Sequence, residues 1–320
     1  MRQLFLPIGL LLAAFFALTL PQAGVVLAGH SSITCTIVLI FLVSGYQTGT
    51  AGIALNRRLL HIFLTAAAVS LLLAPLLGLI VGSLLALPSS LLIGLLIICA
   101  VPPTLSSGIV ITGVSRGNTV LALLLTVSLN LTGLLTLPII LHFCLKAGGP
   151  VAINQWALFS KMLLLVLLPF VLGKTLRTLL KKQRVSPHWS YVNSGCVILA
   201  VYISLAISRQ EFFRTDAGEY LAVLFSVSLV HFLLLGINFR AAKLLRLNTQ
   251  DSKALLFVAS QKTLPVSLAV LAGLHQDTGN AVIVCLLFHF TQLLIDSVLA
   301  SRFRTRDSPE KEIPLPDSSL

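Results

Sequence analysis

Charged residues are scarce in this chain of 320 residues: only 10% are Asp, Glu, Lys or Arg, whereas 57% are hydrophobic. Soluble globular proteins average about 25% charged and about 45–50% apolar residues. With a mean hydropathy of +1.00, the composition excludes a soluble, a disordered and a fibrous protein. One membrane-spanning helix takes about 20 apolar residues, so the chain can hold roughly ten such helices joined by short loops.

Carboxylates are absent from residues 1–210, because Glu211 is the first acidic residue. This absence excludes the carboxylate metal sites and aspartate motifs of many membrane-embedded enzymes from that region. The five cysteines lie apart in apolar stretches and form no C-x-x-C pair, which is typical of packing thiols. The G-x-S-x-G, H-E-x-x-H, P-loop and G-x-G-x-x-G motifs are also missing. An enzyme is therefore the least favoured class, and no cofactor is expected.

The net charge of +12 would suggest nucleic acid binding in a soluble protein. With this hydropathy it instead favours basic loops that face an anionic cytoplasmic leaflet. If the N-terminus is inside, 17 of the 22 Lys and Arg fall on the inner side and four on the outer side. We therefore predict an integral protein of the cell (inner) membrane with both termini in the cytoplasm, in contact with lipid and not with nucleic acid. Apolar spans are expected near 3–21, 31–48, 59–82, 89–114, 119–143, 156–180, 190–207, 220–240, 254–273 and 280–301.

The two halves of the chain are similar to each other. Pro102-Pro103-Thr104-Leu105 in the fourth span has a counterpart in Gln261-Lys262-Thr263-Leu264-Pro265 in the ninth, and Gly117-Asn118 matches Gly279-Asn280. Because each repeat has an odd number of helices, the second enters the membrane from the opposite side, as in many secondary transporters. The prediction is an all-α membrane protein with ten transmembrane helices. Its parts are a first five-helix repeat over 1–146, an inverted second repeat over 147–306 and a disordered cytoplasmic tail over 307–320.

Prolines inside the fourth and ninth spans should break both helices near the middle of the bilayer. Matched interruptions of this kind are the best sequence pointer to a transport site. The alternatives are an ordinary proline kink and polar residues that merely join helices. The candidate substrate- or ion-binding residues are Pro102, Pro103, Thr104, Ser106, Ser107, Thr126, Asn130, Gln261, Lys262, Thr263, His289 and Gln292.

Lys262 is the most informative candidate, because a charge near the bilayer centre is costly and usually functional. Three interpretations are open. Lys262 could bind an anionic substrate, occupy an ion site as a tethered cation, or pair with Asp296 as its charge partner. Asp296 lies six residues before Arg302, so it could instead lie near the inner surface.

Short motifs that carry a family resemblance follow in a fixed order from about residue 3 to 306. They are Phe41-Leu42-Val43-Ser44-Gly45, Pro102-Pro103-Thr104-Leu105-Ser106-Ser107, Arg116-Gly117-Asn118, Leu168-Pro169-Phe170-Val171-Leu172-Gly173, Ser260-Gln261-Lys262-Thr263-Leu264 and Phe288-His289-Phe290-Thr291-Gln292. In these stretches the chain resembles the bile acid:sodium symporter family (solute carrier family 10), and most of all the divergent branch around its seventh mammalian member and bacterial relatives.

The resemblance implies a panel domain and a core domain, with the fourth and ninth helices unwound and crossing in the core. It also implies alternating access and sodium-driven uptake of an organic anion. In the sodium-coupled members, polar residues at the crossover and in the fifth helix bind two sodium ions. Ser106, Ser107, Thr126 and Gln261 fall at or beside the matching positions.

Two departures from the family pattern put sodium coupling in question. Phe257 stands where the sodium-coupled members have a glutamate, and Lys262 replaces the asparagine that follows. Like charges at close range repel by about 4 kcal/mol even at an effective dielectric constant of 20, so two sodium ions beside a charged lysine are not expected. We assign no certain metal site, and Na⁺ or H⁺ is left as the coupling ion.

The functional prediction is a secondary active transporter for a small organic anion. The alternative is a membrane regulator or binding protein that keeps a transporter fold without net transport. A channel is less favoured, since no ring of charged residues is apparent. The substrate and the oligomeric state stay open.

Overall fold

The computed structural model describes residues 5–29, 32–47, 57–148, 155–180, 186, 188–274 and 280–306. Every regular element in these ranges is a helix. Seven helices are long and apolar enough to cross a membrane, or eight if one bent pair counts as a single span. The prediction of an all-helical integral membrane protein is therefore confirmed. Gly279 and the expected disordered tail over 307–320 lie outside the described residues.

The first expected span is bent, which the sequence analysis did not predict. Helix α1 (Phe5–Thr19) is followed by α2 (Pro21–Ala28) at an angle of 95°. Pro21 begins α2 at a position where the missing N–H of proline costs nothing. Helix α3 (Ser32–Gln47) comes next.

Two further spans contain a stretch of π-helix, which the sequence analysis also did not predict. The first consists of α4 (Arg57–Ala67), the π-helix η1 (Ala68–Leu73) and α5 (Ala74–Leu84). The second consists of α9 (Gln155–Met162), the π-helix η2 (Leu163–Leu167) and α10 (Leu168–Leu179). A π turn changes the backbone hydrogen-bond register and often marks a functional site.

Both expected interruptions are confirmed. Helix α6 (Ser89–Ala100) stops before the non-helical residues 101–106, and α7 (Ser107–Val114) follows. Helix α14 (Thr249–Ser260) stops before residues 261–263, and α15 (Leu264–Gly273) follows. The remaining helices are α8 (Thr119–Gly148), α11 (His188–Ile207), α12 (Arg209–Arg214), α13 (Ala217–Leu244) and α16 (Ala281–Arg306).

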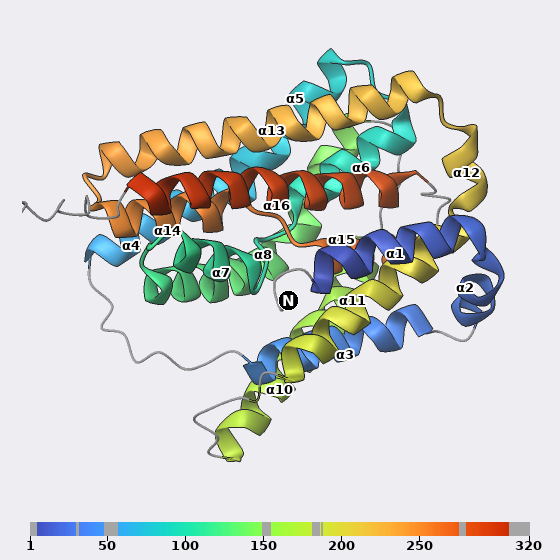
Figure 1. Ribbon diagram of the computed structural model, residues 1–320, viewed down its shortest axis with the longest axis horizontal. Coiled ribbons are helices and arrows are strands. Elements are labelled where there is room, and N and C mark those ends of the chain that lie inside the picture. The colour runs from blue at the N-terminus through green and yellow to red at the C-terminus, as the bar shows by residue number, and fades with distance from the viewer. Residues whose placement is uncertain are drawn as a thin grey trace, which may run out of the picture.

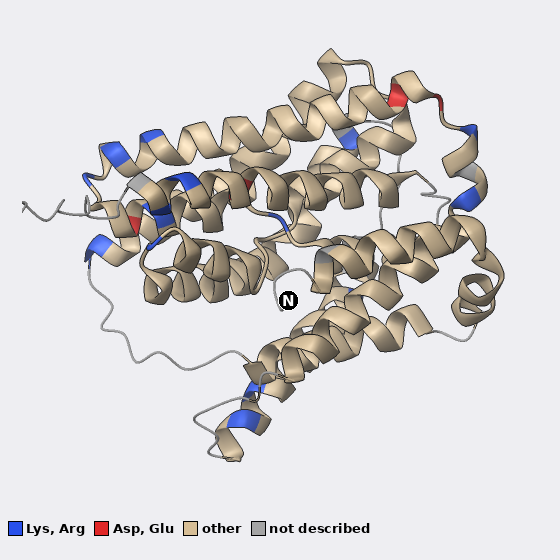
Figure 2. Ribbon diagram, in the orientation of Figure 1, with Lys and Arg blue, Asp and Glu red and all other residues tan. Residues whose placement is uncertain are grey.

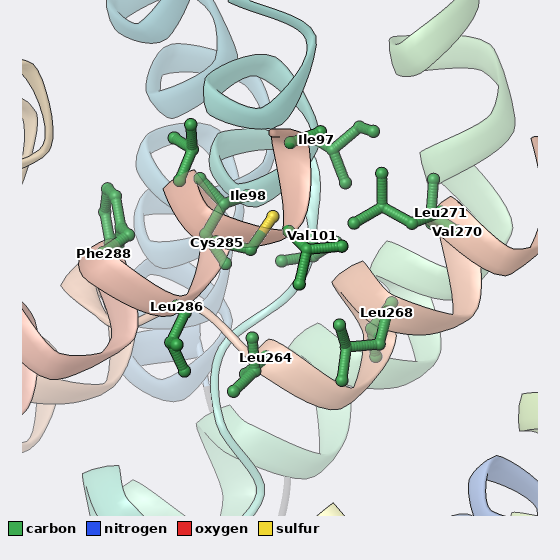
Figure 3. Packing of buried hydrophobic residues seen from close by; sticks show 14 of the residues in the cluster. Ile97, Ile98, Val101, Leu264, Leu268, Val270, Leu271, Cys285, Leu286 and Phe288 are labelled. Atoms are coloured by element: carbon green, nitrogen blue, oxygen red, sulfur yellow. The ribbon is translucent and has the colours of Figure 1, made fainter. Parts of the chain in front are cut away.

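The helices form two groups that pack mainly within themselves. In one group α11 lies against α1, α2 and α3, and α3 lies against α10. In the other, α6, α13 and α16 pack with α4, α5, α7, α8 and α14 (Figure 1). Helix α15 contacts both groups, since it touches α3, α11, α6 and α16. Figure 3 shows how apolar side chains such as Ile98, Leu264, Leu268 and Phe288 converge around the unwound segments.

Lysine and arginine gather at one end of the second helix group (Figure 2). At this end α13 and α16 finish and α4 and α14 begin, whereas the acidic residues Asp216 and Glu219 lie at the start of α13. Basic and acidic residues are therefore concentrated at opposite ends of α13.

Candidate functional site

The two breaks touch each other inside the second helix group. The backbone N–H of Thr263 donates to the carbonyl of Pro102 at 3.1 Å. The side chain of Asn130 in α8 donates to the carbonyl of Pro103 at 3.0 Å and to that of Thr126 at 2.8 Å. Prolines supply no N–H, and irregular backbone at membrane depth must find its partners inside the protein. These contacts therefore explain how the fourth span can stay unwound.

Gln261 joins the second break to the first. Its Oε1 accepts a hydrogen bond from Thr104 at 2.7 Å and lies 2.8 Å from the hydroxyl of Ser107. Its Nε2 donates to Oδ2 of Asp296 in α16 at 2.7 Å. Because Asp296 accepts this hydrogen bond, the amide of Gln261 faces Asp296 with its nitrogen and Thr104 and Ser107 with its oxygen. Gln261 and Asp296 are both fully buried.

Asp296 has a second partner that the sequence analysis did not select. Nε2 of His231 in α13 lies 2.9 Å from Oδ1 of Asp296, and both side chains are fully buried. The hydrogen bonds of Asp296 therefore go to His231 and Gln261, and among the described residues no ion pair of Asp296 with Lys262 is found. The only sequence signal for His231 is a polar residue inside an apolar span, and several other residues share it.

Lys262 bonds to backbone carbonyl groups instead. Its Nζ donates to the carbonyl of Ser70 and, at 3.1 Å, to that of Val101, and it lies 3.3 Å from the hydroxyl of Ser70. Val101 follows the end of α6, and Ser70 lies in η1. Helix ends and π turns leave carbonyls without their usual helical donors. The side chain of Lys262 therefore joins the end of α6 to η1.

The backbone of Lys262 is held as tightly as its side chain. Gln292 in α16 accepts from the N–H of Lys262 at 2.8 Å and donates to its carbonyl at 2.8 Å. The same Nε2 atom of Gln292 lies 3.0 Å from Nδ1 of His289. Gln292 is therefore placed to fix the unwound peptide and not to face an open chamber.

The other candidates lie at the edge of this network. Ser106 is exposed, and its side chain makes no capping bond to α7. Oγ1 of Thr126 and Nε2 of His289 are buried without a hydrogen-bond partner among the described residues. Asn130 lines a small cavity between the two helix groups, opposite Phe41 of α3 and Phe170 of α10.

Lys253 is a second buried lysine, and it lies one residue before the ninth span expected near 254–273. It lies in α14 with 5% of its surface exposed, and its Nζ donates to the carbonyl of Ser115 at 2.5 Å. Ser115 follows the C-terminal end of α7, where a cation complements the helix dipole. Lys253 and Lys262 therefore tie the ninth span to the two halves of the fourth.

A clustered metal site is not seen. Within the described ranges, no group of three or more His, Cys, Asp and Glu could hold a metal ion. Oε1 of Gln261, an oxygen atom at the second break, is already close to two hydroxyl groups.

Comparison with known proteins agrees with the resemblance found in the sequence. The model of the SBF-like CPA transporter family matches residues 4–305. The probable chloroplastic sodium/metabolite cotransporter BASS4 of Arabidopsis thaliana is 30% identical over 317 residues, covering 94% of this chain and 73% of that protein. Sodium/bile acid cotransporter 7 of Danio rerio is 26% identical over 319 residues, covering 95% of this chain and 94% of that protein. An uncharacterized protein of Pseudomonas aeruginosa is 27% identical over 318 residues, covering 95% of each. The chain therefore belongs to the SBF-like CPA transporter family.

Proposed function

We propose that this protein is a secondary active transporter that moves a small organic anion by alternating access. The observation that carries the proposal is the contact between two broken helices, with the Lys262 ammonium group among the carbonyls at the first break. Half-helices that meet inside a membrane protein are typical of transport sites. The names of the relatives, which are cotransporters of sodium with a metabolite or bile acid, support the same class.

The proposed architecture has ten transmembrane spans, arranged as two inverted five-helix repeats. The protein would lie in the cell (inner) membrane, with both termini in the cytoplasm. The positions of the breaks, α6/α7 and α14/α15, support the repeat. The group that contains α3, α10 and α11 would be the panel, and the group that contains both breaks the core. Movement of one group against the other would open the cavity between Phe41 and Asn130.

Lys262 is proposed to act as a tethered cation. Its ammonium group has carbonyl partners from η1 and from the end of α6, which a sodium ion would otherwise need. Lys262 lies just before the start of α15, whose N-terminal end also favours an anion. Transport of the anion would then not require a sodium ion at this position.

Thermal unfolding in sodium and in potassium, at equal ionic strength, tests the tethered cation. We expect no sodium-specific rise of Tm in the wild type, because the ammonium group of Lys262 occupies the position beside the Ser70 and Val101 carbonyls where a sodium ion would bind. In Lys262→Ala the carbonyls of Ser70 and Val101 lose their donor, so Tm should fall, and sodium should then restore part of it by binding only the folded state.

Lys253→Ala is the matched control, since it removes another buried ammonium group that bonds to a carbonyl away from the breaks. It should lower Tm without creating a sodium effect. A sodium-specific rise in the wild type would contradict the tethered cation, and this measurement does not depend on whether a variant folds.

Uptake into proteoliposomes tests the transport function itself. A panel of organic anions would be supplied with sodium, proton or no ion gradients. Uptake of at least one anion without sodium is expected. Absence of uptake under every gradient, with folded protein that still binds an anion, would instead favour a regulator or binding protein.

A further inference from the structure

We propose that a groove between α13, α14 and α16 binds an acyl chain of an anionic phospholipid, with the headgroup at Arg302 and Lys243. This lipid groove lies on an exposed surface of the second helix group, and none of the residues that form the contact between the two breaks lines it. Its lining residues are apolar except for Arg302, and they include Phe232, Gly236, Phe239, Leu256 and Ile295.

The apolar part of the lipid groove exists because α13 lacks a side chain at Gly236. A Cβ atom added there would meet no heavy atom within 4 Å. Phe232, Leu294 and Val298 border the groove with 56%, 69% and 55% of their surface exposed. A flexible hydrocarbon chain fits such a surface, since it gains dispersion contacts without needing any hydrogen-bond partner.

Positive charge is concentrated at one end of the groove. Arg302 lines it directly, and Nζ of Lys243 lies 4.5 Å from the ring centroid of Phe239, another lining residue. Arg240 lines an adjoining groove that shares Phe232 and Gly236. All three cations lie near the C-terminal ends of α13 and α16, in the basic region of Figure 2.

The charges point to an anionic headgroup. The lining residues include no Asp or Glu that could hold the ammonium group of a zwitterionic lipid. Basic pockets between transmembrane helices bind anionic headgroups on the cytoplasmic side of membranes. In the proposed complex the lipid phosphate lies at Arg302 and Lys243, and an acyl chain of the same lipid packs along Gly236 in the apolar part of the groove.

Bound lipid would also brace the elements that hold the breaks. Leu256 lies in the last turns of α14, before the break at residues 261–263, and Ile295 is next to Asp296 in α16. An acyl chain that lies across Leu256 and Ile295 would contact α13, α14 and α16 together. These contacts would be lost if the three helices separated. The inference does not depend on the transport proposal, because binding and stability can be measured without a substrate.

Reconstitution in nanodiscs of two compositions tests the lipid groove. One contains phosphatidylcholine alone, and the other contains phosphatidylcholine mixed with phosphatidylglycerol. We expect phosphatidylglycerol to raise Tm of the wild type, and Arg302→Gln and Gly236→Leu each to remove more than half of that rise. Native mass spectrometry should show bound phosphatidylglycerol on the wild type and less of it on both variants.

Arg57→Gln and Gly218→Leu are the matched controls. Arg57 is an exposed cation of α4 that does not line the groove, and Gly218 lies in α13 with no heavy atom within 4 Å of an added Cβ. Both should keep the full rise of Tm. An equal rise in Arg302→Gln and Arg57→Gln would show a general charge effect and contradict the proposal. Dissociation of a dimer by Gly236→Leu, independent of lipid, would instead identify a second copy as the occupant and contradict it as well.

Discussion

Gly45→Ala is expected to prevent stable packing of α3 against α10. A Cβ atom at Gly45 would lie 1.9 Å from the carbonyl oxygen of Phe170, and one at Gly173 would lie 1.9 Å from that of Leu42. Both contacts are with backbone atoms, so no rotation of a side chain can relieve them. Overpacking typically costs about 1–3 kcal/mol, and we expect a larger loss here because the two helices must move apart.

Size-exclusion chromatography and thermal unfolding of the purified protein check this result. Gly45→Ala and Gly173→Ala should give little monodisperse protein, or protein with a strongly lowered Tm. Gly195→Ala in α11 and Gly218→Ala in α13 are controls, since an added Cβ has no heavy atom within 4 Å at either position. They should leave Tm unchanged or slightly raised, because alanine favours a helix over glycine. Wild-type behaviour of Gly45→Ala would contradict the close approach of α3 and α10.

Asp296→Leu is expected to destabilise the fold and to abolish transport. The substitution leaves Nε2 of His231 and Nε2 of Gln261 buried without their carboxylate partner, whose oxygens lie at 2.9 and 2.7 Å in the native protein. Each buried polar group left without a hydrogen-bond partner costs about 1–3 kcal/mol. It also releases the amide of Gln261, whose Oε1 faces the hydroxyl groups of Thr104 and Ser107.

Asp296→Asn separates the structural effect from the positioning effect. Asparagine keeps an acceptor oxygen at nearly the same place, so Tm should fall much less than in Asp296→Leu. Its amide can also donate, however, and it no longer enforces one orientation of Gln261. Uptake should therefore fall by a larger factor than the loss of folded protein explains. Asp216→Asn is the control, because Asp216 is exposed and its side chain makes no capping bond. This substitution should change neither Tm nor uptake.

A double-mutant cycle measures the link between His231 and Asp296. Adding His231→Phe to Asp296→Leu removes the buried ring nitrogen that lost its partner, and a ring at this position can still pack against Phe288. The double variant should be less destabilised than the sum of the two single variants. Strict additivity of the changes in Tm would argue against a direct interaction of the two side chains.

Local features of the sequence predict where the helices break but not how they bend elsewhere. Pro102 and Pro103 cannot complete a helical hydrogen-bond ladder, so an interruption there follows from the residues themselves. The 95° bend between α1 and α2 and the π turns η1 and η2 were not predicted. Their sequences are apolar like the rest of the spans. The backbone register in such segments depends on contacts with neighbouring helices, which no local pattern contains.

The sequence by itself determined the class of this protein, its family and the position of the two interruptions. These features depend on total hydropathy, on the order of short motifs and on proline, all of which can be seen along the chain. Only the tertiary structure decided the partners of the buried charges. Lys262 meets Ser70 across 192 residues of sequence and Asp296 meets His231 across 65. Which partner each buried side chain meets depends on how several spans pack together. The reason is that the free energy of a buried charge is set by the few groups around it in space and not by its neighbours in the sequence.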